Sequence, residues 1–423
     1  MKAFGKRNGL AYGLLGLPLA FVALPLYVIL PNYYAKEFGV PLAILGAILL
    51  GARLFDAFID PLLGKLSDRL FKRSSAAILQ AGLLAAVVLA AGFALLFFPQ
   101  VKAPNALVVW ATVMLMVTYA AYSFLSVSHQ SWGAMLGGNE AERSRIVAWR
   151  EALGLIGVVL ASVTPVALGM PATTAIFFIA LGIGWLAWTR AVQPIAKKDA
   201  PLAPGAIWLP FKHGNFKRLL LVFMLNGTAS AVPATLVLFF IQDRLQAPAT
   251  MEPLFLGSYF LAAALSIPLW LAIVKRIGLA KAWLWGMALS IAVFSWATQI
   301  GSGQTTAFLI ICALSGVALG TDLALPGAML AGVIQSNGDS GKSEGAYFGW
   351  WNFAIKLNLA LAAGLALPLL GVFGYAPGVR SPEALSALVI AYCVLPCVLK
   401  LAASAALYLF IIQPSSKPLQ VSA

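Results

Sequence analysis

Long stretches without charge recur from one end of the chain to the other, and they constrain its fold more than any other feature. A helix needs about 20 apolar residues to cross a bilayer, and uncharged runs such as 8–35 and 74–101 are long enough to do so. In lipid every backbone polar group needs an internal partner, and a helix provides these partners within itself. The sequence therefore predicts an all-α integral membrane protein.

Turn residues divide the longest runs and bring the count to twelve helices. Pro171 divides the run that follows Arg150, and a Gly-Ser-Gly segment at 301–303 divides the stretch 282–321. Such residues are typical of turns between helices. The predicted transmembrane helices cover residues 10–32, 41–66, 76–98, 105–134, 145–168, 172–192, 217–242, 253–274, 281–300, 305–333, 345–373 and 384–412.

Composition excludes several classes of protein. Of the 423 residues, 61% are hydrophobic and 10% are charged, whereas soluble domains carry about 25% charged residues. A water-soluble enzyme and a disordered protein are thereby excluded. The net charge of +14 would suit a nucleic-acid partner, but the placement of the basic residues has a different explanation.

Lys and Arg residues concentrate in cytoplasmic segments of membrane proteins. With the N-terminus inside, the cytoplasmic segments hold 20 of the 28 basic residues and the outside loops hold four. This bias predicts a multi-pass plasma-membrane protein, in a bacterial inner membrane, with both termini in the cytoplasm. The predicted partners are the lipid bilayer and a small solute, without nucleic acid, and the expected state is a monomer.

The chain divides near its middle. A long polar linker at 193–216 separates a six-helix half at 1–192 from a second at 217–412, and a cytoplasmic tail follows at 413–423. The sequence Gly-Ala-Met-Leu occurs at 133–136 and again at 327–330. Two related halves predict the major facilitator fold, in which the substrate lies near the membrane midplane between them.

Three charged residues cluster on one face of the second predicted helix. Arg53, Asp56 and Asp60 follow the spacing i, i+3, i+7 and share one helix face. Each charge in a membrane costs about 2.5–3.5 kcal/mol on insertion scales, so it needs a partner or a function. Two carboxylates and one guanidinium suit a site for Na⁺, Li⁺ or H⁺. The alternative is a structural Arg–Asp pair.

The fourth predicted helix carries a polar stripe on one face. Ser123 and Ser126 could supply oxygens to a cation or hydrogen bonds to a substrate, or they could bond to carbonyls of their own helix. Gln130 offers a further substrate contact. His129 is either a proton-sensitive group or a packed neutral side chain.

Two basic residues occupy corresponding places in the two halves. Arg150 lies in the fifth predicted helix and Lys356 in the eleventh. Trp351 and Asn352 precede Lys356 by about one turn, and Trp132 offers another aromatic face. Together with Gln130, these five residues are the predicted substrate contacts.

Asp322 is a buried acid in the tenth predicted helix. It could neutralise Lys356 or Lys400, or take part in proton coupling. The segment 64–69 is predicted to form the cytoplasmic turn after the second helix, with Asp68 accepting hydrogen bonds from a neighbouring helix end or an Arg. We assign coupling and gating to Arg53, Asp68, Arg69 and Asp322; the alternative for the turn is a positively charged membrane anchor.

Four segments of the sequence resemble one family of transporters. The sequence RLFDAFIDPLLGKLSDR at 53–69 closely resembles the helix-2 signature of the glycoside–pentoside–hexuronide:cation symporters, the melibiose permease group of the major facilitator superfamily. Tyr12-Gly13, the loop 142–150 into the fifth helix, and 344–356 with its continuation to 375 match in the same order. The resemblance spans both halves.

The resemblance assigns roles to individual residues. Asp56 and Asp60 match the two carboxylates of the family's cation site, and Ser123 stands where a Thr ligand is expected. Lys356 matches a Lys that links the cation and sugar sites, and Arg150 matches an Arg that contacts sugar.

The chain also departs from the melibiose permeases. Leu19-Ala20 replaces a Lys-Asp pair, Ser126 an Asp and Gln130 a Trp, and Gly332 stands at a position that is usually acidic. The cation pair is kept while the carboxylates that hold galactosides are absent.

The function expected from these residues is cation-coupled symport of a sugar, glycoside or related solute by alternating access. The chain has no P-loop, so we expect an ion gradient to supply energy, with no enzyme activity, cofactor or metal beyond a Na⁺ at the acid pair. Na⁺ needs about six oxygens and Ser126 replaces an acid, which favours H⁺. The alternatives are an amphiphile or lysolipid transporter and a non-transporting sensor or scaffold.

The charge of the cargo is a separate expectation. Arg150 and Lys356 lack the opposing acids of the melibiose group, so they could attract an anionic cargo such as a hexuronide or the phosphate of a lysolipid. Alternatively, Asp322 or Glu151 neutralises these bases and leaves no preference for an anion.

Overall fold

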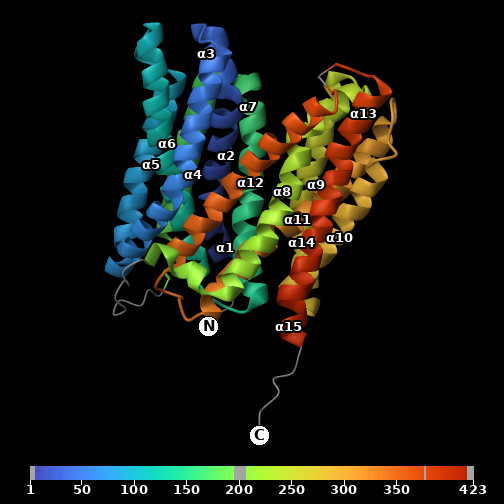
Figure 1. Cartoon of the computed structure of the whole chain (residues 1–423). Coiled ribbons are helices and arrows are strands. Elements are labelled where there is room, and N and C mark those ends of the chain that lie inside the picture. The colour runs from blue at the N-terminus through green and yellow to red at the C-terminus, as the bar shows by residue number, and fades with distance from the viewer. Residues whose placement is uncertain (1–4, 195–205, 376–377, 417–423) are drawn as a thin grey trace. The chain divides into compact units, whose positions relative to one another are not determined.

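The computed structural model describes residues 5–194, 206–375 and 378–416, and every regular element in these ranges is helical (Figure 1). The linker and tail expected at 193–216 and 413–423 lie partly outside the described residues. The α-helices are α1 (Lys6–Gly13), α2 (Gly16–Leu24), α3 (Leu30–Phe38), α4 (Leu42–Arg73), α5 (Ser75–Phe97), α6 (Pro104–Met135), α7 (Glu140–Thr189), α8 (Gly214–Phe239), α9 (Glu252–Ile277), α10 (Leu279–Ala297), α11 (Thr305–Ser336), α12 (Glu344–Val372), α13 (Pro382–Val389), α14 (Leu395–Leu407) and α15 (Gln413–Ser416). Short π-helical turns at Pro25–Ile29, Phe240–Leu245, Ile390–Val394 and Tyr408–Ile412 connect several of them, and 3₁₀ turns occur at Ala206–Lys212 and Ala249–Met251.

The lengths of these helices suit a membrane. Within the described residues, nine helical segments are long and apolar enough to cross a bilayer. Helices α4 and α12 lie outside these nine but have 32 and 29 residues, against the approximately 20 that a crossing requires. The α7 segment is one of the nine and has 50 residues, enough for two crossings. The helices are consistent with the twelve predicted crossings.

Helix α7 contains the break that the sequence predicts near Pro171. Gly169 has φ 78° and ψ 168°, a backbone conformation that interrupts the helix and that glycine adopts readily. The start of α7 differs from the prediction, because it begins at Glu140 rather than at residue 145. Asn139 and Glu142 form a reciprocal capping box there, which satisfies free N–H groups of the first turn.

The predicted turn at 64–69 is wrong. Helix α4 continues through this segment to Arg73, and α5 begins at Ser75. Ser74 alone joins them, and its hydroxyl accepts a hydrogen bond from the Ala77 N–H at 3.0 Å, as an N-cap does. Gly64 therefore lies inside α4, where the absence of a side chain lets α12 approach closely.

The chain forms two compact units. The N-terminal unit comprises residues 1–212 and 331–353, and the C-terminal unit comprises 213–330 and 354–423. The end of α11 and the start of α12 therefore pack with helices of the first half of the sequence.

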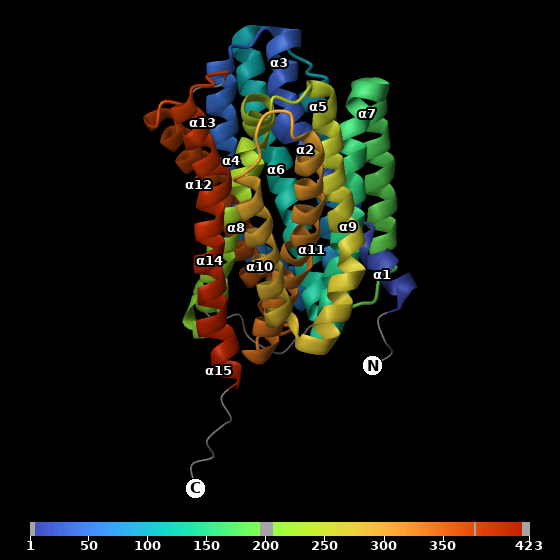
Figure 2. The same cartoon turned by 90° about the vertical axis from the view of Figure 1, so that its right-hand side faces the viewer.

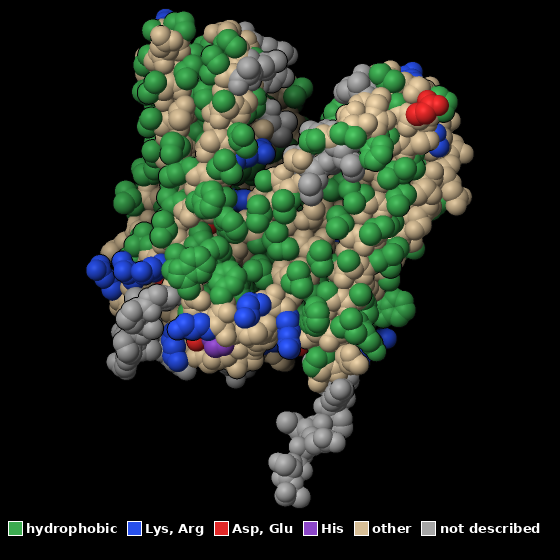
Figure 3. Space-filling view, in the orientation of Figure 1, with side chains coloured by type: hydrophobic (Ala, Val, Ile, Leu, Met, Phe, Trp, Pro, Cys, Tyr) green, Lys and Arg blue, Asp and Glu red, His purple; other side chains and the backbone are tan. Residues whose placement is uncertain are grey.

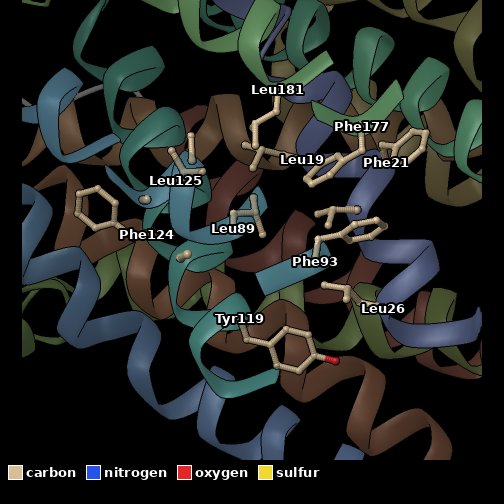
Figure 4. Close-up of a cluster of buried hydrophobic side chains, with 14 of the residues drawn as sticks. Leu19, Phe21, Leu26, Leu89, Phe93, Tyr119, Phe124, Leu125, Phe177 and Leu181 are labelled. Carbon is tan, nitrogen blue, oxygen red and sulfur yellow. The ribbon is translucent and has the colours of Figure 1, made fainter. Parts of the chain in front are cut away.

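Apolar side chains from α2, α5, α6 and α7 form the core of the N-terminal unit (Figure 4). Phe177 lies between Phe21 and Phe93, with ring centroids 5.8 and 4.8 Å away. In the C-terminal unit Phe240 packs between Phe308 and Tyr392 in the same manner. Because lipid tails are as apolar as these side chains, close packing rather than exclusion from water holds the helices together.

Basic side chains gather at one end of the N-terminal unit. In the face shown in Figure 3, many of the visible Lys and Arg side chains of this unit lie at the lower end of its helices. The last turn of α4 contributes Lys72 and Arg73. This is the end predicted to face the cytoplasm.

Candidate functional site

The acid pair on α4 is buried. Asp56 and Asp60 are 1% and 0% exposed and lie one helical turn apart. Helix α6 packs against α4, and the fully buried Ser123 on it donates a hydrogen bond from its hydroxyl to Asp56 Oδ1 at 2.6 Å. The structure thus brings together two carboxylates and a hydroxyl from two helices. Such an oxygen-only set suits a proton or a hard cation.

Tyrosines surround this pair. The Arg53 guanidinium lies over the Tyr27 ring, 4.8 Å from its centroid, a cation–π contact. Tyr119 is buried against Tyr27 with ring centroids 5.4 Å apart. Tyr122 lies within electrostatic range of Asp56 and Asp60. Sequence reasoning did not assign a role to Tyr27 or Tyr122, although Tyr122 directly precedes Ser123.

Arg150 is paired with its neighbour in sequence. Its Nε donates to Glu151 Oε1 at 3.0 Å, and their side chains are 16% and 25% exposed. The Tyr12 hydroxyl, which donates to the His129 carbonyl at 3.1 Å, lies within electrostatic range of Arg150. Both charges of the pair lie within electrostatic range of Tyr122, as Asp56 and Asp60 do. From the sequence, Glu151 was only one of the possible partners of Arg150 and Lys356. The observation that could have singled it out is a second charged residue next to Arg150 inside an apolar helix.

Two residues of the polar stripe on α6 contact each other. Gln130 Nε2 donates to the Ser126 hydroxyl at 2.9 Å, and both side chains are half-buried. His129 is fully buried with its Nε2 2.7 Å from the Tyr12 carbonyl oxygen, and its ring packs on Tyr12 with centroids 4.4 Å apart. The packed form of His129 is therefore the observed one.

Trp132 is a core residue. Its side chain is 0% exposed, its indole N–H donates to the Val192 carbonyl at 2.9 Å, and its ring contacts Trp188 and Phe71. No face of this ring is open for a sugar to stack on. We therefore leave Trp132 out of the substrate contacts proposed below.

Helix α12 carries the remaining candidates of the second half. Trp351 and Asn352 are buried in the N-terminal unit, whereas Lys356 is half-buried in the C-terminal unit. The helix therefore passes from one unit into the other between Phe353 and Ala354.

Asp68 binds the first turn of α12 within the N-terminal unit. Its Oδ1 accepts a hydrogen bond from the Gly345 N–H at 2.6 Å, and its Oδ2 accepts one from Ala346 at 2.9 Å. A carboxylate is favourable at a helix N-terminus because it meets unpaired N–H groups and the positive end of the helix dipole. A methyl group on Gly64 would overlap the Gly345 carbonyl oxygen, so the two glycines allow the helices to touch. Arg69 is exposed.

Asp322 has Lys400 as its charged partner. Lys400 Nζ lies 3.1 Å from Asp322 Oδ2 and donates to Asn226 Oδ1 at 2.8 Å. Ser230 donates to Oδ2 at 3.1 Å, while Asn226 and Trp283 donate to Oδ1 at 2.9 and 2.8 Å. This network lies wholly within the C-terminal unit. Of the partners that the sequence allowed, Lys400 is the observed one.

Comparison with known proteins places the chain among transporters. A family described as MFS/sugar transport protein matches residues 9–413. The chain is 24% identical over 382 residues to "Uncharacterized symporter YjmB" of Bacillus subtilis, covering 85% of this chain and 82% of that protein. It is 24% identical over 406 residues to "Putative sulfoquinovose importer" of Salmonella typhimurium, covering 89% and 83%.

Solved structures share the fold. A bacterial homologue of the iron transporter ferroportin in an outward-facing state has a TM-score of 0.69 at 15% identity, covering 98% of this chain and 100% of that one. The fucose:proton symporter of E. coli has a TM-score of 0.64 at 15% identity, covering 93% and 98%.

Proposed function

The chain belongs to the MFS/sugar transport protein family, and on this premise we propose that its symport is driven by a cation bound at Asp56 and Asp60. The family membership makes it a multi-pass membrane transporter that moves small solutes such as sugars by symport, and not an enzyme. The contact between Ser123 and Asp56 carries the proposal, because it joins the acid pair to a third oxygen in a buried position. Buried carboxylates in membrane helices are functional by default.

We propose H⁺ as the coupling ion. A proton needs a single carboxylate, whereas a Na⁺ site needs about six oxygens by analogy with other hard cations. The Ser126 hydroxyl, which stands where relatives of the melibiose group have an acid, is engaged by Gln130. Protonation of the acid pair removes negative charge from the low-dielectric interior, so the loaded and empty protein differ in electrostatic energy. Alternating access uses such a difference to couple the two solutes.

The proposed cargo is a sugar or glycoside. Arg150 and Glu151 together offer hydrogen-bond donors and acceptors without net charge, which suits sugar hydroxyl groups. Gln130, Ser126 and Asn352 are further predicted contacts from the N-terminal unit. This interpretation favours a sugar over the amphiphile or lysolipid that the sequence also allowed.

An acidic sugar derivative is the second candidate. Arg150 and Lys356 are the basic residues that would contact its acidic group. One relative is named for the import of sulfoquinovose, an anionic sugar. The ion pair between Arg150 and Glu151 argues against an acidic cargo, because Glu151 already neutralises the charge of Arg150.

We further propose that both termini lie in the cytoplasm, that the membrane is a bacterial inner membrane, and that the protein works as a monomer. The basic end of α4 supports the orientation, and the bacterial relatives support the location. Asp68 at the start of α12 is the proposed cytoplasmic gate contact.

Uptake into proteoliposomes tests the function. The purified protein is reconstituted and offered neutral sugars, glycosides and acidic sugars, first with an inward H⁺ gradient and then with an inward Na⁺ gradient. We expect at least one sugar to accumulate above its external concentration under the H⁺ gradient, and a protonophore to abolish the accumulation. Accumulation under the Na⁺ gradient alone would replace H⁺ by Na⁺. Cargo that exchanges across the membrane but never accumulates under either gradient would refute cation coupling.

A further inference from the structure

A cavity lies inside the C-terminal unit, apart from the acid pair of the N-terminal unit. It has a volume of about 320 Å³, and its walls come from α8, α9, α10, α11, the π-helical turn Ile390–Val394 and α14. Figure 2 shows the course of these helices. Binding cavities for small molecules have volumes of about 300–1,000 Å³. This cavity is therefore large enough for one small molecule.

Aromatic side chains form much of its wall. Phe255, Tyr259, Phe260, Phe294 and Tyr392 all line it. The Phe294 and Tyr392 rings lie 5.7 Å apart, and Tyr259 and Phe260 lie 5.1 Å apart. An aromatic side chain that lines a cavity can pack against a further ring edge-on or offset. The walls therefore favour a ligand with an aromatic body.

Three buried residues with a side-chain hydroxyl line this cavity. Ser290, Ser315 and Tyr392 line the cavity and are 5%, 9% and 5% exposed. A hydroxyl group can donate one hydrogen bond and accept others, so these side chains supply polar contacts for a ligand oxygen.

The charges at the cavity wall cancel. Asp322 and Lys400 both line it and form an ion pair. Each Asp322 oxygen already accepts two hydrogen bonds. Lys400 uses two of its three N–H groups, on Asn226 and Asp322. The wall therefore retains N–H and O–H donors but no net charge, and a charged ligand would lose its hydration without gaining a counter-ion.

We propose that this cavity is a second binding site, for a neutral aromatic molecule of one or two rings with a hydroxyl or carbonyl head. The rings pack against the aromatic wall, and the head oxygen accepts hydrogen bonds from Lys400 and the Ser290 and Ser315 hydroxyls. The proposal does not rest on cation coupling, since every lining residue belongs to the C-terminal unit.

The native cysteines provide the readout. Cys312 and Cys397 line the cavity, whereas Cys393 is fully buried outside the lining. The full chain in lipid nanodiscs is treated with N-ethylmaleimide, with and without 4-(hydroxymethyl)benzophenone, and alkylation of each cysteine is measured by mass spectrometry. We expect the probe to slow alkylation of the two lining cysteines with saturation. Irradiation of the bound probe should label peptides of α10, α11 and α14.

Matched variants and probes locate the binding. Ser290→Ala should raise the probe concentration for half-protection about fivefold, the usual effect of one hydrogen bond, and Ser315→Leu should abolish protection by filling the cavity. Ser258→Ala is the control, because Ser258 lies outside the lining and its hydroxyl bonds to the Phe255 carbonyl of its own helix. The anion 4-benzoylbenzoate should not protect, and Asp56→Asn should bind the probe like the unmodified protein.

Three results would overturn the proposal: no protection and no saturable photolabelling by the neutral probe, equal protection by the anion, or undiminished protection in Ser315→Leu. Because Cys393 is buried outside the lining, its alkylation indicates that a variant has unfolded. If Ser315→Leu unfolds in this way, the result for Ser290→Ala tests the proposal instead. Loss of gradient-driven accumulation in Asp56→Asn with unchanged probe protection separates this site from the coupling site.

Discussion

At the scale of single residues, the hydroxyl of Ser123 is the group that ties α6 to the acid pair. It donates to Asp56 at 2.6 Å and therefore stabilises the charged form of that carboxylate. In Ser123→Ala the charged form loses this donor, so a proton binds more readily. We expect the pH of half-maximal transport to rise by about one unit, since a hydrogen bond to a charged group contributes about 1.5–3 kcal/mol.

The pH profile of uptake in proteoliposomes checks this prediction. Ser131→Ala is the control, because Ser131 is equally buried on α6 but bonds to the Val127 carbonyl of its own helix. If the pH of half-maximal transport shifts no more in Ser123→Ala than in Ser131→Ala, Ser123 does not take part in proton coupling. A fall in Na⁺ affinity with an unchanged pH profile would instead indicate that Ser123 is a Na⁺ ligand.

The ion pair of the C-terminal unit should matter for stability rather than for coupling. Lys400→Met leaves the buried Asp322 without its counter-ion, and breaking one side of a buried pair costs about 3–5 kcal/mol. We expect the midpoint of thermal unfolding in detergent to fall by several degrees. The double variant Asp322→Asn/Lys400→Met should recover much of the loss because no unpaired charge remains. Equal midpoints for Lys400→Met and the unmodified chain would contradict this role.

Some of these residues could be found from sequence and others could not. The sequence was enough to place Asp56 and Asp60 on one face, because residues four positions apart in a helix lie on the same side. The partners of Arg150 and Asp322 depend on rotamers and on which helices touch, so Glu151 and Lys400 stood only among several options. Trp132 illustrates the same limit, since an aromatic residue in a helix has the same pattern whether it faces a core or a cavity.

At the scale of the helices, the contact of α4 with α12 is the candidate gate. Asp68→Ala removes both hydrogen bonds to the first turn of α12. We expect the transport rate to fall by about tenfold or more, as the loss of about 1.5–3 kcal/mol per charged hydrogen bond implies, while the equilibrium affinity for cargo stays nearly unchanged. Rates from uptake and affinities from equilibrium binding check this together.

Gly345→Ala tests the same contact by a different route. A methyl group there would overlap the Gly64 carbonyl oxygen, so it should also slow transport without weakening cargo binding. Gly51→Ala on α4 is the control, because a methyl group at that position meets nothing within 4 Å. If Asp68→Ala and Gly345→Ala weakened binding as much as rate, the contact would belong to the cargo site and not to a gate.

The helix boundaries show where sequence reasoning stopped. The break in α7 was predicted from Pro171 because proline restricts the residues before it. The turn expected at 64–69 was wrong because α4 continues to Arg73. Glycine occurs both in turns and in close helix contacts in membranes, and Gly64 makes such a contact. The sequence of α4 alone could not distinguish these uses, since the deciding partner, Gly345, lies about 280 residues away.

At the scale of the whole molecule, the charge of the cargo is the next question. With Arg150 neutralised by Glu151, we expect a neutral sugar to compete for uptake at least as well as its uronate counterpart. Competition assays that pair each sugar with its uronate measure this directly. Lys356→Gln should then weaken both classes equally, as a coupling residue would. A preference for uronates that is lost in Lys356→Gln would favour the acidic cargo.

Accumulation by Asp56→Asn in proteoliposomes tests the central claim, cation coupling at the α4 acids, most directly. The variant keeps the size of the side chain but removes its charge and its proton site. Under an inward H⁺ gradient we expect the unmodified protein to concentrate its sugar and Asp56→Asn only to equilibrate it, while exchange of labelled for unlabelled sugar continues. Gradient-driven accumulation by Asp56→Asn at the level of the unmodified protein would contradict coupling at this site.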